Sequence, residues 1–155
     1  MRKMSAGGNL LAEPWLRHPA AAGVQAGHRL QLLLDPHQAW LQLLADLRAA
    51  RNTLDVELYM LVQDRIGQAF ADALGAAAAR GVRVRLLLDA VGSLGLPLPR
   101  LWTLQRAGVE LQLFRPPWLH WSASRWLHRD HRKTIVVDGA VGYVLDRKST
   151  RLNSS

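Results

Sequence analysis

The chain has 155 residues, of which 49% are hydrophobic, and this predicts one folded domain with a sizeable core rather than a disordered polypeptide. Its net charge of +8 suits anionic partners such as nucleic acid, acidic lipid headgroups or phosphorylated substrates, although arginine-rich usage can equally reflect genome composition. The lack of cysteine excludes disulfides, thiolate metal sites and cysteine catalysis, and Glu13 and Arg17 interrupt any apolar run that would predict a signal peptide or membrane span.

The elements expected along the chain alternate between strands and helices. Residues 1–27 are rich in Gly, Ala and Pro without periodicity, and we expect them to form an arm of low order. Short apolar runs predict strands at Arg29–Leu34, Leu54–Leu61, Val82–Leu88, Val109–Phe114 and Thr134–Val137. Amphipathic segments predict helices from Pro36 to about Arg51, from Ile66 to Arg80 and from Pro99 to Ala107. This order predicts an α/β fold with a mixed or largely parallel sheet flanked by helices.

The predicted helices carry recognisable start and stop signals. Asp35 precedes Pro36 as an N-cap precedes a proline at the first helical position. Gly81 and Gly108 follow the second and third helices, where glycine commonly ends a helix. The first helix has a core-facing stripe at helical spacing, made of Trp40, Leu43, Leu44 and Leu47.

The strand predicted at Leu54–Leu61 has two unlike faces. Its apolar face holds Val56, Leu58 and Met60, and its other face holds Asp55, Glu57 and Tyr59. A polar face on a strand of an α/β sheet either meets solvent or lines a site. Glu57 and Tyr59 are therefore candidates for residues that support a site.

The segment from His128 to Gly139 carries a histidine, a lysine and an aspartate at the spacing His-x-Lys-x-x-x-x-Asp, as His131, Lys133 and Asp138. If the apolar strand that follows extends back through His131, His131 and Lys133 project to the same side. An imidazole beside a fixed positive charge suits phosphoryl chemistry. His128 and His131 also stand three residues apart, but without a set of nearby carboxylates we do not expect a metal site.

Three tryptophans, Trp118, Trp121 and Trp126, are interleaved with basic groups such as Arg125 just before this motif. Indoles favour the headgroup region of a membrane and cations favour anionic lipid, so this pattern indicates a loop that lies at the membrane interface or holds the substrate. Packing of the tryptophans over the sheet edge explains the same pattern, and both interpretations stay open.

The chain resembles the phospholipase D superfamily, and within it the bacterial cardiolipin synthases. His131, Lys133 and Asp138 fill the superfamily signature, and a bare signature of this length is a weak signal. Two further segments match in the same order: Glu57–Tyr59 with Asp64 and Gly67, and Arg80–Asp89 with Gly92 and Ser93. The matches extend over roughly residues 28 to 144. The resemblance implies a phospholipase D-like lobe over residues 28–145.

The resemblance also implies covalent catalysis at phosphorus. In the family, one histidine forms a phosphohistidine and a second histidine, from a second copy of the motif, protonates the leaving alcohol. Carried over, His131 is the nucleophile or its acid/base partner, Lys133 holds the phosphate oxygens, and Asp138 supports the motif. Glu57 and Tyr59 are candidates for residues that contact and support these groups. The mechanism needs no metal and no cofactor.

The C-terminal residues depart from the family. A glycine pair and an asparagine are expected about six residues after the motif aspartate, but Leu145 and Asp146 stand there. Residues 146–155 match the translation of a common sequencing-library adapter, so we interpret them as a non-native tail; a genuine hydrophilic tail is the alternative. The lobe is then incomplete and holds only the first motif of a pair. The second would come from the rest of a longer parent chain or from a dimer partner.

The implied parent enzyme is a phosphatidyltransferase acting on anionic phospholipid of the phosphatidylglycerol type, bound peripherally at the cytoplasmic side of a bacterial cell membrane. The fragment itself is expected to be inactive. A phosphodiesterase acting on nucleic acid is the first alternative, disfavoured by the synthase-like Glu57–Tyr59 and Asp89–Ser93 segments. A non-catalytic domain that binds anionic membranes is the second.

Overall fold

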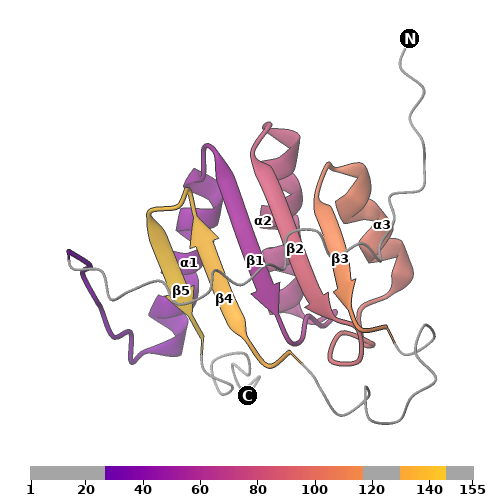
Figure 1. Cartoon of the computed structure of the whole chain (residues 1–155), viewed down its shortest axis with the longest axis horizontal. Helices are drawn as coiled ribbons and strands as arrows, with labels where there is room; N and C mark the ends of the chain where they lie inside the picture. Colours follow the sequence, from indigo (N-terminus) through magenta and orange to yellow (C-terminus); the bar gives the residue numbers. More distant parts are fainter. Residues whose placement is uncertain (1–26, 117–129, 146–155) are drawn as a thin grey trace.

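The computed structural model describes residues 27–116 and 130–145, which form a five-stranded sheet and three helices (Figure 1). This confirms the predicted α/β class. The elements in chain order are α1 (Pro36–Ala49), β1 (Thr53–Leu58), α2 (Arg65–Ala79), β2 (Arg83–Asp89), α3 (Leu98–Arg106), β3 (Glu110–Phe114), β4 (Lys133–Val137) and β5 (Val141–Val144).

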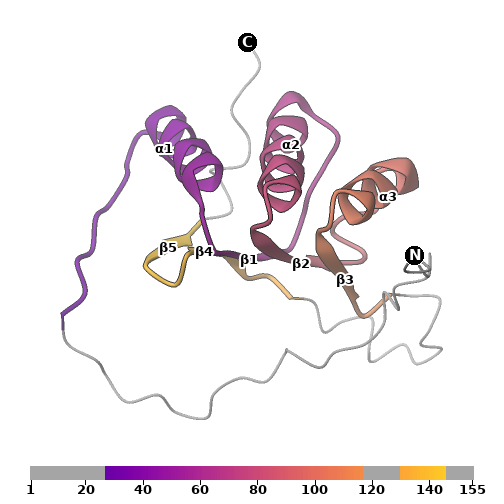
Figure 2. The ribbon, with the colours of Figure 1, turned by 90° about the horizontal axis from the view of Figure 1, so that it is seen from above.

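The sheet is mixed, with strand order β3-β2-β1-β4-β5. β1, β2 and β3 are parallel neighbours, whereas β4 runs antiparallel to both β1 and β5. Seen from above, α1, α2 and α3 all lie on one face of this sheet (Figure 2). The described part of the chain is therefore a two-layer structure whose other sheet face carries no helix from residues 27–116 or 130–145.

Local sequence explains where the first two helices begin. The Asp35 carboxylate accepts hydrogen bonds from the backbone N–H of His37 (2.8 Å) and Gln38 (3.3 Å), and Pro36 occupies the first turn. Asp64 caps α2 by accepting from the N–H of Gly67 at 2.7 Å. A methyl group at Gly67 would lie 1.9 Å from the Val62 carbonyl oxygen, so this position requires glycine.

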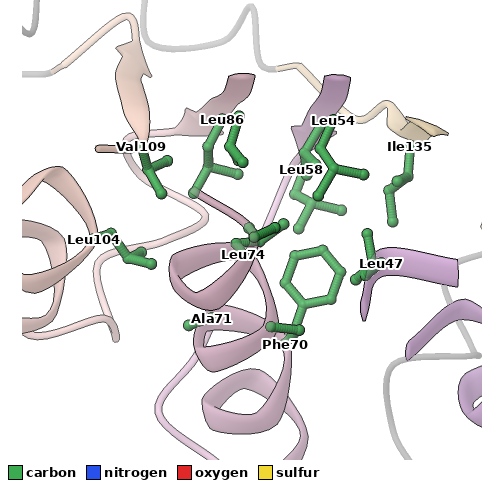
Figure 3. Packing of buried hydrophobic residues seen from close by; sticks show 14 of the residues in the cluster. Leu47, Leu54, Leu58, Phe70, Ala71, Leu74, Leu86, Leu104, Val109 and Ile135 are labelled. Carbon is green, nitrogen blue, oxygen red and sulfur yellow. The ribbon is translucent and has the colours of Figure 1, made fainter. Parts of the chain in front are cut away.

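The core lies between the helix layer and the sheet (Figure 3). Alternate residues of the strands point into it, because side chains alternate between the two faces of a strand. Leu74 of α2 and Ile135 of β4 are both 0% exposed, so the motif strand belongs to the same core as the rest of the sheet. The predicted inward positions Leu43, Leu44, Leu47, Val56 and Leu58 are all buried.

Three sequence predictions differ from the structure. Arg29–Leu34 is not a strand: no strand of the described residues pairs with it, and its leucines Leu30, Leu32 and Leu34 are 94%, 82% and 82% exposed. β1 ends at Leu58 rather than Leu61, because the chain turns away toward the cap of α2. β5 was not predicted, since its short sequence Val-Gly-Tyr-Val becomes a strand only by pairing with β4. Residues 1–26 of the expected arm and the tail 146–155 lie outside the described residues.

Leu74→Ala should reduce the free energy of unfolding by about 2–5 kcal/mol, because it removes a fully buried side chain and leaves a cavity. Chemical denaturation followed by circular dichroism measures this change. Leu41→Ala is the matched control, since Leu41 is 53% exposed. Equal effects of the two substitutions would contradict the described packing.

Candidate active site

The sequence motif begins where β4 begins, at the carboxyl ends of β1 and β2. Lys133 lies opposite Leu58, the last residue of β1, and the N–H of Tyr59 donates to the Arg132 carbonyl at 3.1 Å. β4 does not extend back to His131, so the predicted strand alternation does not apply to that residue. His131 lies just before the strand and is exposed, whereas Lys133 is half-buried.

The His131 imidazole stacks on the ring of Tyr59. The ring centroids are 4.5 Å apart and the ring planes are inclined by 25°. Such offset stacking stabilises one orientation of the smaller ring and leaves its edges accessible. The structure therefore brings together His131, the candidate reactive group, and Tyr59, a candidate supporting residue.

Glu57 lies beside the motif strand. Its Oε2 accepts a hydrogen bond from the Thr134 hydroxyl at 3.1 Å, and an Arg132 guanidinium nitrogen lies 3.6 Å from its Oε1. Burial, followed by hydrogen bonding to Asp130 and the negative charge of Asp130, raises the pKa of Glu57 to about 7. A carboxyl group that changes charge near neutral pH thus lies next to the residue that precedes His131.

Asp138 lies at the opposite end of β4 from His131. Its carboxylate accepts from the backbone N–H groups of Arg51 (3.0 Å), Asn52 (2.7 Å) and Thr53 (2.8 Å), and its own N–H donates to the Thr53 carbonyl at 2.8 Å. The bond from Thr53, followed by those from Arg51 and Asn52, lowers the pKa of Asp138. These contacts tie the β4–β5 turn to the α1–β1 loop and support the interpretation that Asp138 stabilises the motif.

An apolar hollow borders the Lys133 end of β4. It is lined by Leu58 of β1, residues of α1 and α2 such as Trp40 and Phe70, and Leu145. The N–H of Leu145 donates to the Lys133 carbonyl at 3.0 Å. Opposite residues of an antiparallel pair project from the same face, so Lys133 leaves the sheet on the side of this hollow, as Leu58 does.

Two buried polar residues, one at the end of β2 and one in the turn that follows it, have no role predicted from the sequence. Asp89 and Ser93 are 1% and 7% exposed. Both belong to the segments that carry the family resemblance, and their burial marks them as candidate supporting residues. Asp55, on the polar face of β1, pairs instead with Arg85 of β2 and is part of the sheet surface.

Several candidates lie outside the described residues, namely Trp118, Trp121, Arg125 and Trp126. Within residues 27–116 and 130–145, no three His, Asp or Glu side chains are grouped as a metal would require. Over the same ranges, no helix combines the length and the apolar character needed to cross a bilayer.

The model of one protein family, described as cardiolipin synthase, PLD-like domain, matches residues 43–154. The chain belongs to this phospholipase D-like family. Among curated relatives, the cardiolipin synthase of Geobacillus kaustophilus is 36% identical over 128 residues, covering 83% of this chain and 25% of the relative. That of Staphylococcus aureus strain Mu50 is 32% identical over 124 residues, covering 80% and 25%. The chain thus spans about a quarter of the length of these relatives.

Among solved structures, NucT from Helicobacter pylori is similar with a TM-score of 0.48 and 14% identity, over 66% of this chain and 62% of that one.

Glu57→Gln should flatten the pH dependence of stability. The folded-state pKa of about 7 lies above the ordinary value of 4.5, so the contribution of Glu57 to the free energy of unfolding is fully present below pH 4.5 and is lost as pH rises through 7. The fall should be about 1–3 kcal/mol, since one pKa unit corresponds to about 1.4 kcal/mol and the group is partly solvated. Urea denaturation between pH 4 and 8 measures it, with the exposed Glu110→Gln as the matched control. An unchanged pH profile in Glu57→Gln would contradict the assigned environment.

Asp138→Ala should lower the melting temperature, because three backbone N–H groups lose their acceptor at once. Asp138→Asn should lower it less, since one side-chain oxygen still accepts. The lowered pKa predicts that the contribution of Asp138 is present above its ordinary pKa of 3.8 and is lost as pH falls through the folded-state value. Calorimetry at pH 6 and at pH 2.5 tests both points: the two variants should differ from the original chain less in acid.

Proposed function

We propose that this chain supplies the first half of the active site of a cardiolipin synthase-like phosphatidyltransferase. The observation that carries the proposal is His131 at an accessible position beside Lys133, in a chain of the phospholipase D-like family. The reaction joins two phosphatidylglycerol-type lipids and releases glycerol. The full activity belongs to a longer parent protein, since this chain spans about a quarter of its curated relatives.

In the proposed first step, a ring nitrogen of His131 attacks the lipid phosphorus. The bond from phosphorus to the glycerol oxygen breaks, and a histidine of a second motif gives a proton to that oxygen. In the second step, the hydroxyl of an acceptor lipid loses its proton to the same histidine and attacks the phosphohistidine, which frees His131. The Lys133 ammonium group binds the non-bridging phosphate oxygens, where charge increases in the transition state. Stacking on Tyr59 holds the His131 ring in one plane during attack.

The apolar hollow beside Lys133 supports a lipid substrate. The hollow is lined by Trp40, Phe70 and Leu58, and Leu58 is the strand partner of Lys133, so an apolar body in the hollow suits a molecule whose anionic head binds Lys133. The net charge of +8 also suits contact with anionic lipid at the cytoplasmic face of a bacterial membrane, where we propose that the parent enzyme acts peripherally. Membrane contact by the tryptophans between residues 118 and 126 is part of the same proposal.

The second motif must come from outside this lobe, either from the remainder of the parent chain or from a dimer partner. The residues after Leu145 lack the glycine pair and asparagine that the family resemblance leads one to expect, and we attribute residues 146–155 to adapter sequence. The polypeptide is therefore proposed to be inactive by itself. Measurable transphosphatidylation by the purified 155-residue chain would refute this, and other codons across the tail would refute its assignment.

One alternative has an observation in its favour. The basic charge suits the phosphate backbone of nucleic acid as well as it suits lipid, so a phosphodiesterase acting on DNA or RNA is the second candidate. The hollow beside Lys133 favours the lipid reading, because a nucleic-acid backbone has no apolar body to place there.

His131→Ala in a parent protein with both motifs should reduce phosphatidyl transfer by about 10³-fold or more, because the proposed reaction loses the histidine that attacks phosphorus. Lys133→Ala should reduce it by about 10²–10³-fold through loss of transition-state charge stabilisation. Phosphatidylglycerol vesicles with product analysis provide the measurement, and the exposed His37→Ala is the matched control.

Unchanged lipid transfer in His131→Ala would leave the chain as a membrane-binding domain without catalytic function. Cleavage of DNA by the parent protein, abolished in His131→Ala and without lipid transfer in the original, would instead favour the phosphodiesterase.

A further inference from the structure

A buried carboxylate ends the central strand of the parallel part of the sheet, next to the motif. Asp89, the last residue of β2, is 1% exposed and is among the largest fully buried side chains of the described residues. A buried carboxylate is costly unless its oxygens accept hydrogen bonds. The positions of its partners therefore indicate what this side chain does.

The two oxygens of Asp89 bind different parts of the chain. Oδ1 accepts from the backbone N–H groups of Val91 (3.0 Å) and Gly92 (2.9 Å), which closes the turn that follows β2. Oδ2 accepts from the backbone N–H of Asp130 at 3.2 Å, across 41 residues of sequence. Asp130 directly precedes His131, so one carboxylate joins the turn to the main chain that carries the candidate nucleophile.

The same turn packs against the residue on which His131 stacks. A methyl group added at Gly92 would lie 2.0 Å from the carbonyl oxygen of Tyr59 and 3.1 Å from a carbon of its ring, so turn and tyrosine are in direct contact. The buried Ser93 hydroxyl accepts from the N–H of Leu61 at 3.2 Å and ties the turn to the same segment a second time. The tyrosine ring then stacks on His131.

We propose that Asp89 is a positioning residue for His131. It fixes the backbone on the N-terminal side of His131 through Asp130, and it shapes the turn that holds the Tyr59 ring beneath the imidazole. The inference rests on the proposed function in taking His131 as the group that must be aimed at phosphorus. Asp89 itself has no contact with the His131 ring among those described, so it acts through the backbone and through Tyr59.

The chemistry requires aspartate rather than its amide. All the partners named above are N–H donors, and only a carboxylate presents two accepting oxygens. In Asp89→Asn the remaining oxygen can still accept from Val91 and Gly92, but the new NH₂ group then faces the N–H of Asp130. The substitution thus leaves the turn closed and breaks the link to the motif segment, with almost no change in volume.

The test uses NMR of the 155-residue chain labelled at histidine, with the His131 ring signals assigned by their loss in His131→Ala. Tyr59→Leu defines the His131 ring shifts without stacking, and Tyr59→Phe should restore the stacked values. In Asp89→Asn the His131 signals should move most of the way toward those of Tyr59→Leu. His131 signals that stay at the original values in a folded Asp89→Asn chain would overturn the proposal.

Asp35→Ala separates positioning from general loss of stability. It removes another carboxylate that accepts backbone N–H groups, at the start of α1, and should lower the melting temperature without moving the His131 signals. If Asp35→Ala moves the His131 signals as Asp89→Asn does, the effect is general and the proposal is wrong.

If Asp89→Asn does not fold, amide hydrogen exchange of the original chain tests whether Asp89 holds the backbone at Asp130. The N–H of Asp130 should be protected to the same degree as ladder amides of β4, and an unprotected Asp130 amide would overturn the proposal.

The two proposals fail separately. In a parent protein that transfers phosphatidyl groups, Asp89→Asn should reduce kcat at least tenfold with little change in KM, since positioning acts on the reacting group rather than on lipid binding. An unchanged kcat there would overturn the positioning role and leave the proposed function intact. If the His131 signals respond to Asp89→Asn but the parent protein has no transferase activity, the positioning role stands and the proposed function is wrong.

Discussion

The antiparallel pairing of β4 with β1 is the interaction on which the rest of the structure depends. It aligns residues 133–137 with residues 54–58, although some 75 residues of chain separate them. The pairing adds an antiparallel edge to a parallel core, so the start of β4 coincides with the carboxyl ends of β1 and β2. Loops at the carboxyl ends of parallel strands are where α/β sheets commonly bind ligands. The register of this one pair therefore decides that His131 lies beside Tyr59 and near Asp89.

Aspartates hold both ends of the motif strand to the rest of the lobe. Asp138 accepts backbone N–H groups of the α1–β1 loop after β4, and Asp89 accepts the N–H of Asp130 before it. Both use a carboxylate to satisfy main-chain donors that no strand or helix pairs. The positive φ of 52° at Asp138 belongs to the tight turn into β5, a conformation that aspartate tolerates better than most residues. The strand between them is fixed by core packing through Ile135.

Sequence periodicity was a good guide wherever a segment's partners are local or simply apolar. The cap at Asp35, the helix-ending Gly81 and Gly108, and the inward face of β1 all agree with the structure, because each depends on contacts within a few residues or on burial alone. The strand predicted at Arg29–Leu34 was wrong, because its apolar residues fit the strand pattern but a strand also needs a neighbouring strand to pair with. β5 was not predicted, because its short sequence becomes a strand only through antiparallel pairing with β4.

By itself, the sequence determined the fold class, the order of most elements and the identity of His131 and Lys133 as candidate reactive groups, since motif spacing and resemblance are properties of the chain in order. The tertiary structure alone decided what surrounds them. It stacked His131 on Tyr59, placed the half-buried Glu57 against Asp130, and directed Asp138 and Asp89 toward backbone N–H groups. The long-range contacts among them join residues that are 41 to 87 positions apart, and their distances follow from strand register and core packing, which no local pattern encodes.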